Sequence, residues 1–426
     1  MLKNKNNSFI RQSHTPSRQI PSEEFEVDLV FYYTKENRNS FNALGGALES
    51  SGLSGVRIIL PETEKELTET VRASLAKPHK TVIALSFFTA QVPHIERVIR
   101  RLRAHFGARA LILAGGAHSS GAPEQVLGMG ADHIVCGEGE KAIVDFTRAL
   151  LEGEPPGQKI IKTAGTLTLD DYLPFSPKWH MFGSIEITRG CPFGCSYCQT
   201  SYLFGTKARH RSLDNLLSLA ELMKTEKLMS IRFISPDAFA YGSDGRRLAL
   251  DKVEALLKGT SAILGNKGQI FFGTFPSEVR PDHVTRETLQ LTRLYATNRR
   301  LVIGAQSGSA RMLEAIHRGH TVADIYHAAE LAAASGFSAD MDFIFGLPGE
   351  TENDAELTIK VMGDMVKLGT RIHAHTFMPL PQTPFAGDSP APISAKTENF
   401  IRTLCSGGHA FGQWEKQKLL GKPLTW

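Results

Sequence analysis

Three observations predict an α/β protein of two domains. Short apolar runs alternate with amphipathic stretches in two separate blocks, at 26–152 and 184–378. A segment rich in proline and glycine divides the two blocks. The 426 residues also exceed what one hydrophobic core usually organises. We therefore predict a doubly wound, Rossmann-like domain followed by a partial (β/α)6 barrel.

The first block predicts a parallel sheet covered on both faces, because each apolar run is followed by a helical stretch. In such a sheet, ligands bind at the carboxyl ends of the strands. The predicted strands are 26–33, 56–60, 81–86, 108–114 and 131–136, and the predicted helices are 41–50, 62–76, 93–105, 122–128 and 138–152.

The second block repeats the alternation and predicts six βα-type units. Sites in barrels of this kind also lie at the carboxyl ends of the strands. The predicted strands are 184–188, 230–235, 269–275, 301–306, 338–346 and 371–378, and the predicted helices are 212–226, 247–258, 282–294, 309–317, 322–335 and 352–368.

These patterns divide the chain into five parts. Residues 1–24 form a basic tail, which we expect to be disordered and either solvated or in contact with an acidic partner. The Rossmann-like domain spans 25–152, a linker 153–180, the barrel 181–381 and a small C-terminal segment 382–426.

Composition excludes several classes of protein. Hydrophobic residues make up 42% of the chain and charged residues 22%, and no apolar run is long enough to span a membrane. Five cysteines in a chain of this length are not a disulfide framework, so we expect a cytoplasmic protein. The sequence contains no recognisable nucleic-acid-binding module. Neither a membrane nor a nucleic acid is therefore an expected partner.

The stretch TRGCPFGCSYCQT places Cys191, Cys195 and Cys198 in a C-x3-C-x2-C pattern directly after the first barrel strand. Clustered cysteines hold zinc or iron–sulfur clusters. A structural zinc site needs a fourth ligand, and His210 is the nearest candidate. A 4Fe–4S cluster on three cysteines instead leaves one iron open to a cofactor.

The cysteine spacing, with Tyr197 before the last cysteine, resembles the radical S-adenosylmethionine (SAM) superfamily. This resemblance implies a 4Fe–4S cluster on Cys191, Cys195 and Cys198, with SAM chelated to the open iron. Reductive cleavage of SAM would yield methionine and a 5′-deoxyadenosyl radical. An electron donor such as flavodoxin or ferredoxin would then be a partner.

Three further motifs, IGAQSGS (303–309), DFIFGLPGET (342–351) and MPLPQTPF (378–385), resemble the branch that joins methylthiotransferases and cobalamin-dependent radical SAM enzymes. That branch usually has glutamate where this chain has Gln306. A loop that starts a helix would also explain GLPGET by itself. The candidate SAM-binding residues are Tyr197, Asp237, Ser277, Arg280, Gln306 and Ser307, and for Arg280 and Asp237 a helix-start role is the alternative.

The N-terminal block distinguishes the two members of that branch. A methylthiotransferase needs three more cysteines there, and only Cys136 precedes residue 180. Ser86-Phe87-Phe88 and Gly115-Gly116 instead resemble two marked loops of the cobalamin-binding fold, with the usual interval between them. A generic doubly wound domain, in which Gly-Gly is only a turn, is the alternative.

The first loop departs from the cobalamin pattern. Asn42 stands where the cobalt-ligating histidine would be, and Ser40 stands where its aspartate partner would be. The resemblance therefore implies cobalamin without a protein imidazole on its lower face, which Tyr33, Arg38, Asn42 or Leu44 would line. The candidate cobalamin-binding residues are Arg38, Asn42, Ser86, Phe88, Gly115, Gly116, His118, Gly137 and Glu138.

Together the two resemblances imply a cobalamin-dependent radical SAM C-methyltransferase that acts on an unactivated carbon of a small molecule or a protein residue. The compact form resembles enzymes that methylate the Cα of a glutamine in methyl-coenzyme M reductase. Two alternatives stay open: a non-methylating radical reaction such as cyclisation, and a SAM- or cobalamin-binding sensor without turnover.

Overall fold

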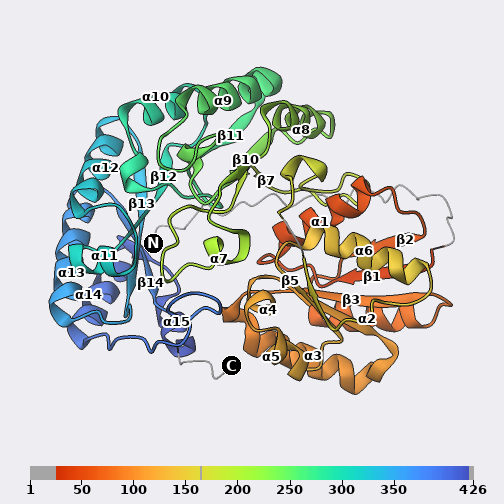
Figure 1. Ribbon diagram of the computed structural model, residues 1–426. Coiled ribbons are helices and arrows are strands. Elements are labelled where there is room, and N and C mark those ends of the chain that lie inside the picture. Colours follow the sequence, from red (N-terminus) through yellow and green to blue (C-terminus); the bar gives the residue numbers. More distant parts are fainter. Residues whose placement is uncertain (1–24, 164–165, 422–426) are drawn as a thin grey trace, which may run out of the picture.

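The computed structural model describes residues 25–163 and 166–421 (Figure 1). The predicted basic tail at 1–24 lies outside the described residues. Figure 1 shows the barrel on the left and the N-terminal domain on the right, with α7 (Thr200–Phe204) between them. Within the described ranges, no helix is both long and apolar enough to cross a membrane.

The N-terminal domain is built on one parallel sheet of six strands, in the order β2-β1-β3-β4-β5-β6. The registers pair Val27 with both Val56 and Lys80, so β1 lies between β2 and β3. The strands are β1 (Val27–Phe31), β2 (Val56–Ile59), β3 (Lys80–Ser86), β4 (Leu111–Gly115), β5 (His133–Cys136) and β6 (Ile160–Lys162).

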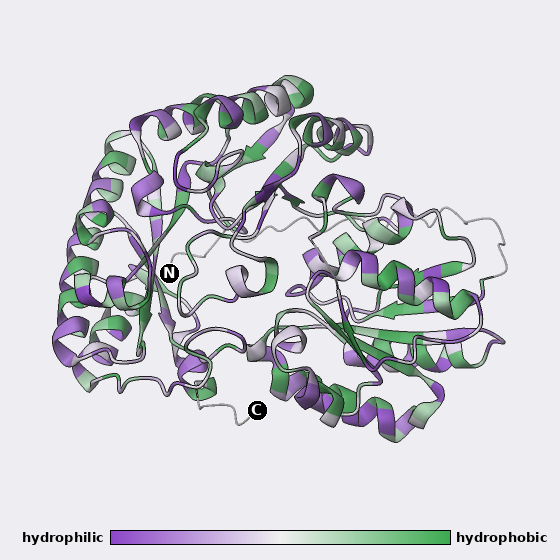
Figure 2. Cartoon of the chain, viewed as in Figure 1, coloured by the Kyte–Doolittle hydropathy of each residue, from purple (hydrophilic) through white to green (hydrophobic). Residues whose placement is uncertain are grey.

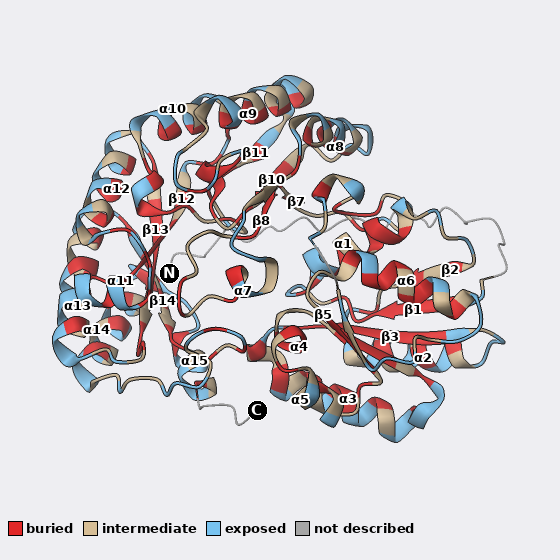
Figure 3. Cartoon of the chain, in the orientation of Figure 1, coloured by how far each residue is buried: buried red, intermediate tan, exposed pale blue. Residues whose placement is uncertain are grey.

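Helices cover both faces of this sheet, as its almost wholly buried strands require (Figure 3). Alternate residues of β1 divide between two apolar clusters, one with α1 and α6 and the other with α2 and α3. The helices are α1 (Arg38–Ser50), α2 (Glu64–Leu75), α3 (Val92–Phe106), α4 (Ala117–Gly121), α5 (Pro123–Gly128) and α6 (Gly139–Leu151).

Strand β6 lies inside the segment that the sequence predicts as a linker. Its three residues are partly or fully exposed, so they lack the apolar pattern of the inner strands. Parallel pairing of Ile134 with Ile160 adds them to the sheet beside β5.

The second domain is an open barrel of two parallel sheets. One has the order β11-β10-β7 and the other β12-β13-β14-β15, and a parallel bridge between Val279 and Ile303 links them. The strands are β7 (Ile185–Glu186), β10 (Ser230–Ile234), β11 (Gln269–Phe271), β12 (Arg300–Gln306), β13 (Ser338–Phe345), β14 (Arg371–Thr376) and β15 (Ala410–Phe411), and a short antiparallel pair joins β8 (Thr188–Arg189) to β9 (Arg209–His210).

Helices form the outer layer of the barrel, and their hydrophobic residues face the strands (Figure 2). Met341, Phe343 and Phe345 of β13 belong to this buried apolar core. Because side chains alternate along a strand, Asp340 and Asp342 point the other way, into the barrel. The helices are α8 (Leu213–Thr225), α9 (Leu250–Leu264), α10 (Arg286–Tyr295), α11 (Ala310–Ala315), α12 (Val322–Ala334), α13 (Glu352–Lys367), α14 (Ala395–Ser406) and α15 (Trp414–Leu420).

The C-terminal segment is part of the barrel wall. Strand β15 pairs in parallel with β14, matching Ala410 to Ile372 and Phe411 to His373. The side chain of Gln417 from α15 bonds back to the backbone N–H of Thr376 at 3.0 Å. The barrel's edge strand is therefore supplied by the last described residues of the chain.

Candidate functional site

The cysteine loop lies at the carboxyl end of the first barrel strand and is fastened to its surroundings by its backbone. The N–H of Ser196 donates to Ile316 O at 3.0 Å, and the N–H of Cys191 donates to Gly205 O at 3.1 Å. Both ring nitrogens of His210 are engaged, with Thr188 Oγ1 at 3.0 Å and Ser243 O at 2.7 Å. His210 is therefore occupied elsewhere, which removes the nearest fourth ligand that a zinc site would need.

The entry to the loop is fixed by a glycine and an arginine. Gly190 has a φ of +85°, and a Cβ there would lie 2.5 Å from the carbonyl oxygen of Lys207. Next to it, the buried Arg189 guanidinium contacts Glu186 and Glu140, both at 2.6 Å. Glu140 belongs to α6, so the strand that leads into the cysteines is tied to the N-terminal domain.

Arg318 is the buried cation beside the cysteines. Its Nη1 lies 3.8 Å from Cys195 Sγ, and its Nη2 donates to Gly304 O at 2.8 Å. Three thiolates around a 4Fe–4S cluster carry net negative charge, which a buried guanidinium stabilises. Burial raises the pKa of the Cys191 thiol to about 11, so iron binding there displaces a proton. These donors and this charge fit a cluster.

Among the predicted SAM contacts, Asp237 has a buried carboxylate oxygen that is available to a ligand. It follows β10, and its Oδ2 is hydrogen-bonded to His283 Nδ1. Its Oδ1 is buried without a hydrogen-bond partner. A buried carboxylate oxygen without a donor is costly, so this atom fits an ammonium group such as that of SAM.

Two predicted SAM contacts have hydroxyls that the fold already uses. Ser277 Oγ donates to Phe233 O at 2.6 Å and accepts from the N–H of Ser235 at 3.0 Å. Ser307 Oγ lies 3.3 Å from Thr358 Oγ1 and accepts from Ser309 N–H at 3.1 Å. Both residues lie at carboxyl ends of strands, and their contacts with SAM stay predictions.

Arg280 is almost completely buried and holds the cysteine loop from below. Its guanidinium carbon lies 3.5 Å from the ring centroid of Phe193, between the first two cysteines. Its Nη1 donates to Arg318 O at 2.8 Å, and its Nε lies 3.0 Å from Asp282 Oδ1. These contacts position the loop and Arg318, whereas the predicted fork to the SAM carboxylate stays untested.

Gln306 and Tyr197 both lie at the barrel mouth. Gln306 ends β12 at a bulge, with a φ of +71°. A Cβ built on Gly304 would meet the Gln306 amide nitrogen at 2.8 Å and Arg318 Nη2 at 2.5 Å, so amide and guanidinium are neighbours. Tyr197 packs against the barrel core, and burial raises its pKa far above the ordinary value. The neutral amide brings no charge to Arg318, whereas the Glu278 carboxyl does, since the same Cβ would lie 3.2 Å from Glu278 Oε2.

The carboxyl edge of the N-terminal sheet offers backbone and apolar surface. Ser86 and Gly115 are paired at the ends of β3 and β4. Gly116 has a φ of +92°, and a Cβ there would lie 2.8 Å from Phe87 N. Phe88 beside it is 49% exposed, which is unusual for phenylalanine. A bare backbone next to an exposed ring fits a large, flat, mostly apolar cofactor.

Other predicted cobalamin contacts have partners of their own. His118 is fully buried, with Nδ1 3.1 Å from Thr89 Oγ1 and Nε2 2.9 Å from Gln125 Oε1. Gly137 has a φ of +91°. Glu138 forms an ion pair with Arg209 of the barrel. His118 and Glu138 thus lie next to this edge with their polar atoms engaged, and their contacts with cobalamin stay untested.

The first loop is closed around Asn42. The amide oxygen of Asn42 accepts from Tyr33 Oη at 2.6 Å, and its buried Nδ2 has no partner. The guanidinium of Arg38 lies 5.2 Å from the Tyr33 ring, and burial raises the pKa of that phenol to about 12. Leu44 packs in the apolar cluster of this domain. These four residues are the candidates for the lower face of cobalamin, and among them Arg38 is about half exposed and accessible to a ligand.

Gln199 joins the two candidate cofactor edges. It directly follows the third cysteine, and its Nε2 donates to Ala117 O at 3.2 Å and to Pro381 O at 2.9 Å. Ala117 follows the Gly115-Gly116 pair, so one amide touches both the cysteine loop and the glycine loop. Gln382 Nε2 adds a bond to Ser120 O at 2.9 Å. The two carboxyl edges therefore face each other.

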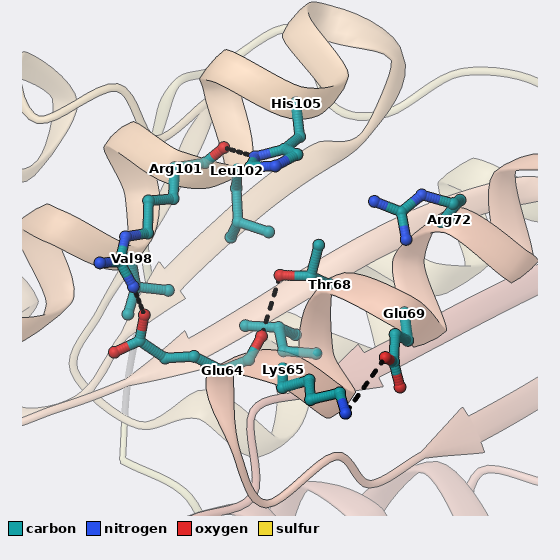
Figure 4. Close-up of a pocket in the computed structure, with 10 residues that line it drawn as sticks. Glu64, Lys65, Thr68, Glu69, Arg72, Val98, Arg101, Leu102 and His105 are labelled. Carbon is teal, nitrogen blue, oxygen red and sulfur yellow. Dashed lines mark hydrogen bonds and ion pairs between the residues drawn. The ribbon is translucent and has the colours of Figure 1, made fainter.

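A hollow on the outside of the N-terminal domain is a separate feature. Residues of α2 and α3 line it, among them Glu64, Arg72, Arg101 and His105 (Figure 4). Arg101 Nη1 donates to Glu64 Oε2 at 2.6 Å across it. The hollow lies on the helical exterior, away from both carboxyl edges.

Sequence reasoning missed several residues at the site. Arg318, Glu278 and Gln199 have no short motif that marks them in a single sequence, because their role depends on what the fold places beside them. The sequence HAH (373–375) could have marked His373 and His375 as a pair, because residues two apart on a predicted strand lie on the same face.

With this geometry described, comparison with known proteins identifies the class. Residues 35–147 match the B12-binding domain family, and residues 185–362 match the radical SAM superfamily. The chain therefore joins a B12-binding domain to a radical SAM domain. The predicted fold class is confirmed, and so is the cofactor set that these two domain types define: a 4Fe–4S cluster, SAM and cobalamin.

The chain is also similar to several curated proteins. An uncharacterized protein of Methanopyrus kandleri is 24% identical over 381 residues, which cover 77% of this chain and 72% of that protein. An uncharacterized methyltransferase of Pyrococcus horikoshii is 24% identical over 71% of this chain and 68% of its own length. A tRNA-2-methylthio-N(6)-dimethylallyladenosine synthase of Moorella thermoacetica is 30% identical, but over 46% of this chain and 43% of that enzyme.

Solved structures show the same fold. The radical S-adenosylmethionine methyltransferase TsrM of Kitasatospora setae, with cobalamin and a 4Fe–4S cluster bound, has a TM-score of 0.65 at 15% identity and covers 86% of this chain and 80% of its own. The cobalamin-dependent S-adenosylmethionine radical enzyme OxsB has a TM-score of 0.62 at 17% identity and covers 94% of this chain and 57% of its own. At such identities the likeness establishes the fold.

Proposed function

We propose that this protein is a cobalamin-dependent radical SAM C-methyltransferase that methylates an unactivated carbon. The contact of Gln199 with both the cysteine loop and the glycine loop carries the proposal, because it brings the two candidate cofactor edges together. Methyl transfer to a carbon radical needs such proximity, since the radical must meet the methyl donor before it reacts elsewhere.

The cofactors supply the chemistry, namely hydrogen abstraction on the side of the cluster and a methyl group on the side of the corrinoid. The residues of the chain supply position and charge. Arg318 and Asp237 provide opposite charges at the barrel mouth, and Gly116 allows close approach at the other edge. Hydrogen bonds of Gln199 and Gln382 join the two edges, and we call this contact the seam.

For the acceptor we propose a carbon of a protein residue, such as the Cα of a glutamine in methyl-coenzyme M reductase. The support is the resemblance stated for the sequence. A small-molecule acceptor is the alternative that the neighbours suggest, since TsrM has been solved with tryptophan as its substrate. A one-electron donor of the flavodoxin or ferredoxin class completes the proposed partners.

The test begins with anaerobic purification in the presence of cobalamin, where we expect about four irons and about one corrinoid per chain. Reduced enzyme is then given SAM and either a glutamine-containing peptide or free amino acids. A product heavier by one methylene unit, formed with S-adenosylhomocysteine and 5′-deoxyadenosine, supports the proposal. Product without added mass would instead establish a non-methylating reaction, and absence of deoxyadenosine under strong reduction would leave a sensor.

A further inference from the structure

The inner face of the barrel carries a cluster of two histidines and one aspartate, which are side chains of types that bind metals. In β14, Ile372 and Ala374 face the buried core, so His373 and His375 face the interior. In β13, Asp342 faces the same way and is in register with His373. Two imidazoles and a carboxylate therefore project side by side from neighbouring strands.

Their candidate ligand atoms form a compact triangle. Asp342 Oδ1 lies 2.8 Å from His373 Nδ1 and 3.9 Å from His375 Nε2, and the two ring nitrogens are 3.2 Å apart. A metal about 2.1 Å from each ligand places those ligands roughly 3 to 3.5 Å from one another. Among the described residues, the ligand atoms of this trio lie 2.8 to 3.9 Å from one another, close to the spacing of a metal centre.

Hydrogen bonds alone do not satisfy this triangle. Gln417 Oε1 accepts from Thr376 N–H at 3.0 Å, so its NH2 group faces His375 Nδ1 at 3.3 Å. That contact puts the His375 proton on Nε2, aimed at His373 Nδ1. His373 Nδ1 must then accept from His375 and cannot donate to Asp342 as well. One shared cation resolves the conflict when it displaces the His375 Nε2 proton, because Nε2, His373 Nδ1 and Asp342 Oδ1 then each offer it a lone pair.

The charges around Asp342 also favour a bound cation at this position. One register position earlier, Asp340 is paired with two arginines, Arg300 at 2.6 Å and Arg371 at 2.9 Å. Among the described residues, Asp342 is paired with no arginine or lysine, and its partners are His373 and His375. The barrel interior thus has permanent cations beside Asp340 and only imidazoles beside Asp342.

We propose that Asp342, His373 and His375 bind a divalent transition metal ion, Zn²⁺ or Fe²⁺, inside the barrel. Two imidazoles with one carboxylate are a ligand set of catalytic zinc and non-haem iron sites, and they leave positions open for an oxygen ligand. The ring of His373 is oriented by stacking on Phe411, with centroids 4.5 Å apart. The open positions face the interior, where a carbonyl or carboxylate of the acceptor can bind.

Neighbouring charged groups lie between the site and the cysteines. A Cβ built on Gly304 would meet both Arg318 Nη2 and Glu278 Oε2, so these two groups are neighbours, and Arg318 Nη1 lies 3.8 Å from Cys195 Sγ. A metal here would orient an acceptor oxygen beneath the proposed cluster. The proposal concerns binding and is independent of whether the protein methylates its substrate.

The test is equilibrium dialysis of the full chain, with its cluster assembled, against Zn²⁺ alone, with zinc and iron counted by mass spectrometry. We expect one bound Zn²⁺ that is lost in His373→Asn/His375→Asn, with a Kd raised about 100-fold. The matched control, His180→Asn/His327→Asn, removes two exposed histidines and should bind as the wild type does. Equal binding by the first variant, or none by the wild type, overturns the proposal and identifies any zinc as adventitious.

A gain-of-affinity variant keeps the test decisive if the double variant does not fold. In Gln417→Glu, one carboxylate oxygen can accept from Thr376 N–H and the other from His375 Nδ1–H, which leaves Nε2 free for the metal. We expect about tenfold tighter Zn²⁺ binding, as carboxylate–histidine–metal contacts produce. Weaker or unchanged binding contradicts the proposal. The Fe²⁺ arm uses Mössbauer spectra, in which a high-spin ferrous signal separate from the cluster should follow the same variants.

Discussion

The two carboxyl edges that face each other in this protein share a topology and differ in chemistry. The edge of the N-terminal sheet presents glycine backbone and an exposed phenyl ring at Gly115, Gly116 and Phe88. The barrel mouth presents buried charge, with Arg318 beside Cys195 and Asp237 beside His283. Parallel βα units bring ligands to the same end of each sheet, and the residues at that end decide which ligand fits.

The difference follows from the ligands that each edge is proposed to hold. A corrin is broad and mostly apolar, so removing side chains and exposing one ring accommodates it. A cluster with thiolates and a zwitterionic SAM needs compensating charges at fixed positions, which buried arginine and aspartate supply. Variants that affect one edge alone should therefore change one cofactor alone.

The largest effect is expected from Cys195→Ser. Removing the buried cysteine takes away a cluster ligand, so iron content should collapse and deoxyadenosine formation should fall by about a thousandfold or more. Corrinoid content should stay the same. Cys405→Ser in α14 is the control, and it should keep full iron content. Retention of the cluster spectrum by Cys195→Ser would contradict the assignment.

Gly116→Ala tests the other edge. The new Cβ would sit 2.8 Å from Phe87 N on a backbone with positive φ, so we expect a loss of about 1–3 kcal/mol in unfolding free energy. Corrinoid binding should weaken about tenfold, while iron content is unchanged. Gly128→Ala, where nothing lies within 4 Å, is the control. Spectrophotometric titration with cobalamin measures the difference.

Asp354→Asn tests a buried charge of the barrel by the pH dependence of the unfolding free energy. Burial opposes ionisation, but hydrogen bonds from Arg311, Ser309 and Thr351 hold the Asp354 pKa far below its usual range. A depressed pKa stabilises the fold above the unfolded pKa, about 4, and that stability is lost as pH falls further. We expect the variant to lose roughly 1–3 kcal/mol at pH 7 and progressively less below pH 4. Denaturant unfolding at several pH values checks this, and a pH-independent loss would refute the charge argument.

Gln199→Ala should have the smallest effect, because it removes two amide hydrogen bonds worth about 1 kcal/mol each and no cofactor ligand. Iron and corrinoid contents should both be unchanged. The amount of methylated product per deoxyadenosine should fall, since the two edges are less firmly held together. Gln158→Ala on an exposed loop is the control. An unchanged product ratio would show that the seam does not depend on this amide.

Much of this organisation is predictable from sequence, because it rests on local patterns. The five strands of the first block and the six of the second are strongly apolar, and each was found. Strand β6 was missed because its residues are exposed, and β15 was missed because two residues carry no period. Among the site residues, the cysteines can be predicted from their spacing. Arg318 does not, since its significance depends on tertiary neighbours brought in by the turn after α11.

The pairing of β15 with β14 has a consequence for folding during synthesis. Phe411 stacks on His373, and Gln417 reaches His375 and Thr376, so the inner face of β14 is completed by residues that follow it beyond α14. The strands of the N-terminal sheet all lie within residues 27–162. The N-terminal sheet can therefore form on the ribosome before the inner face of β14 is complete.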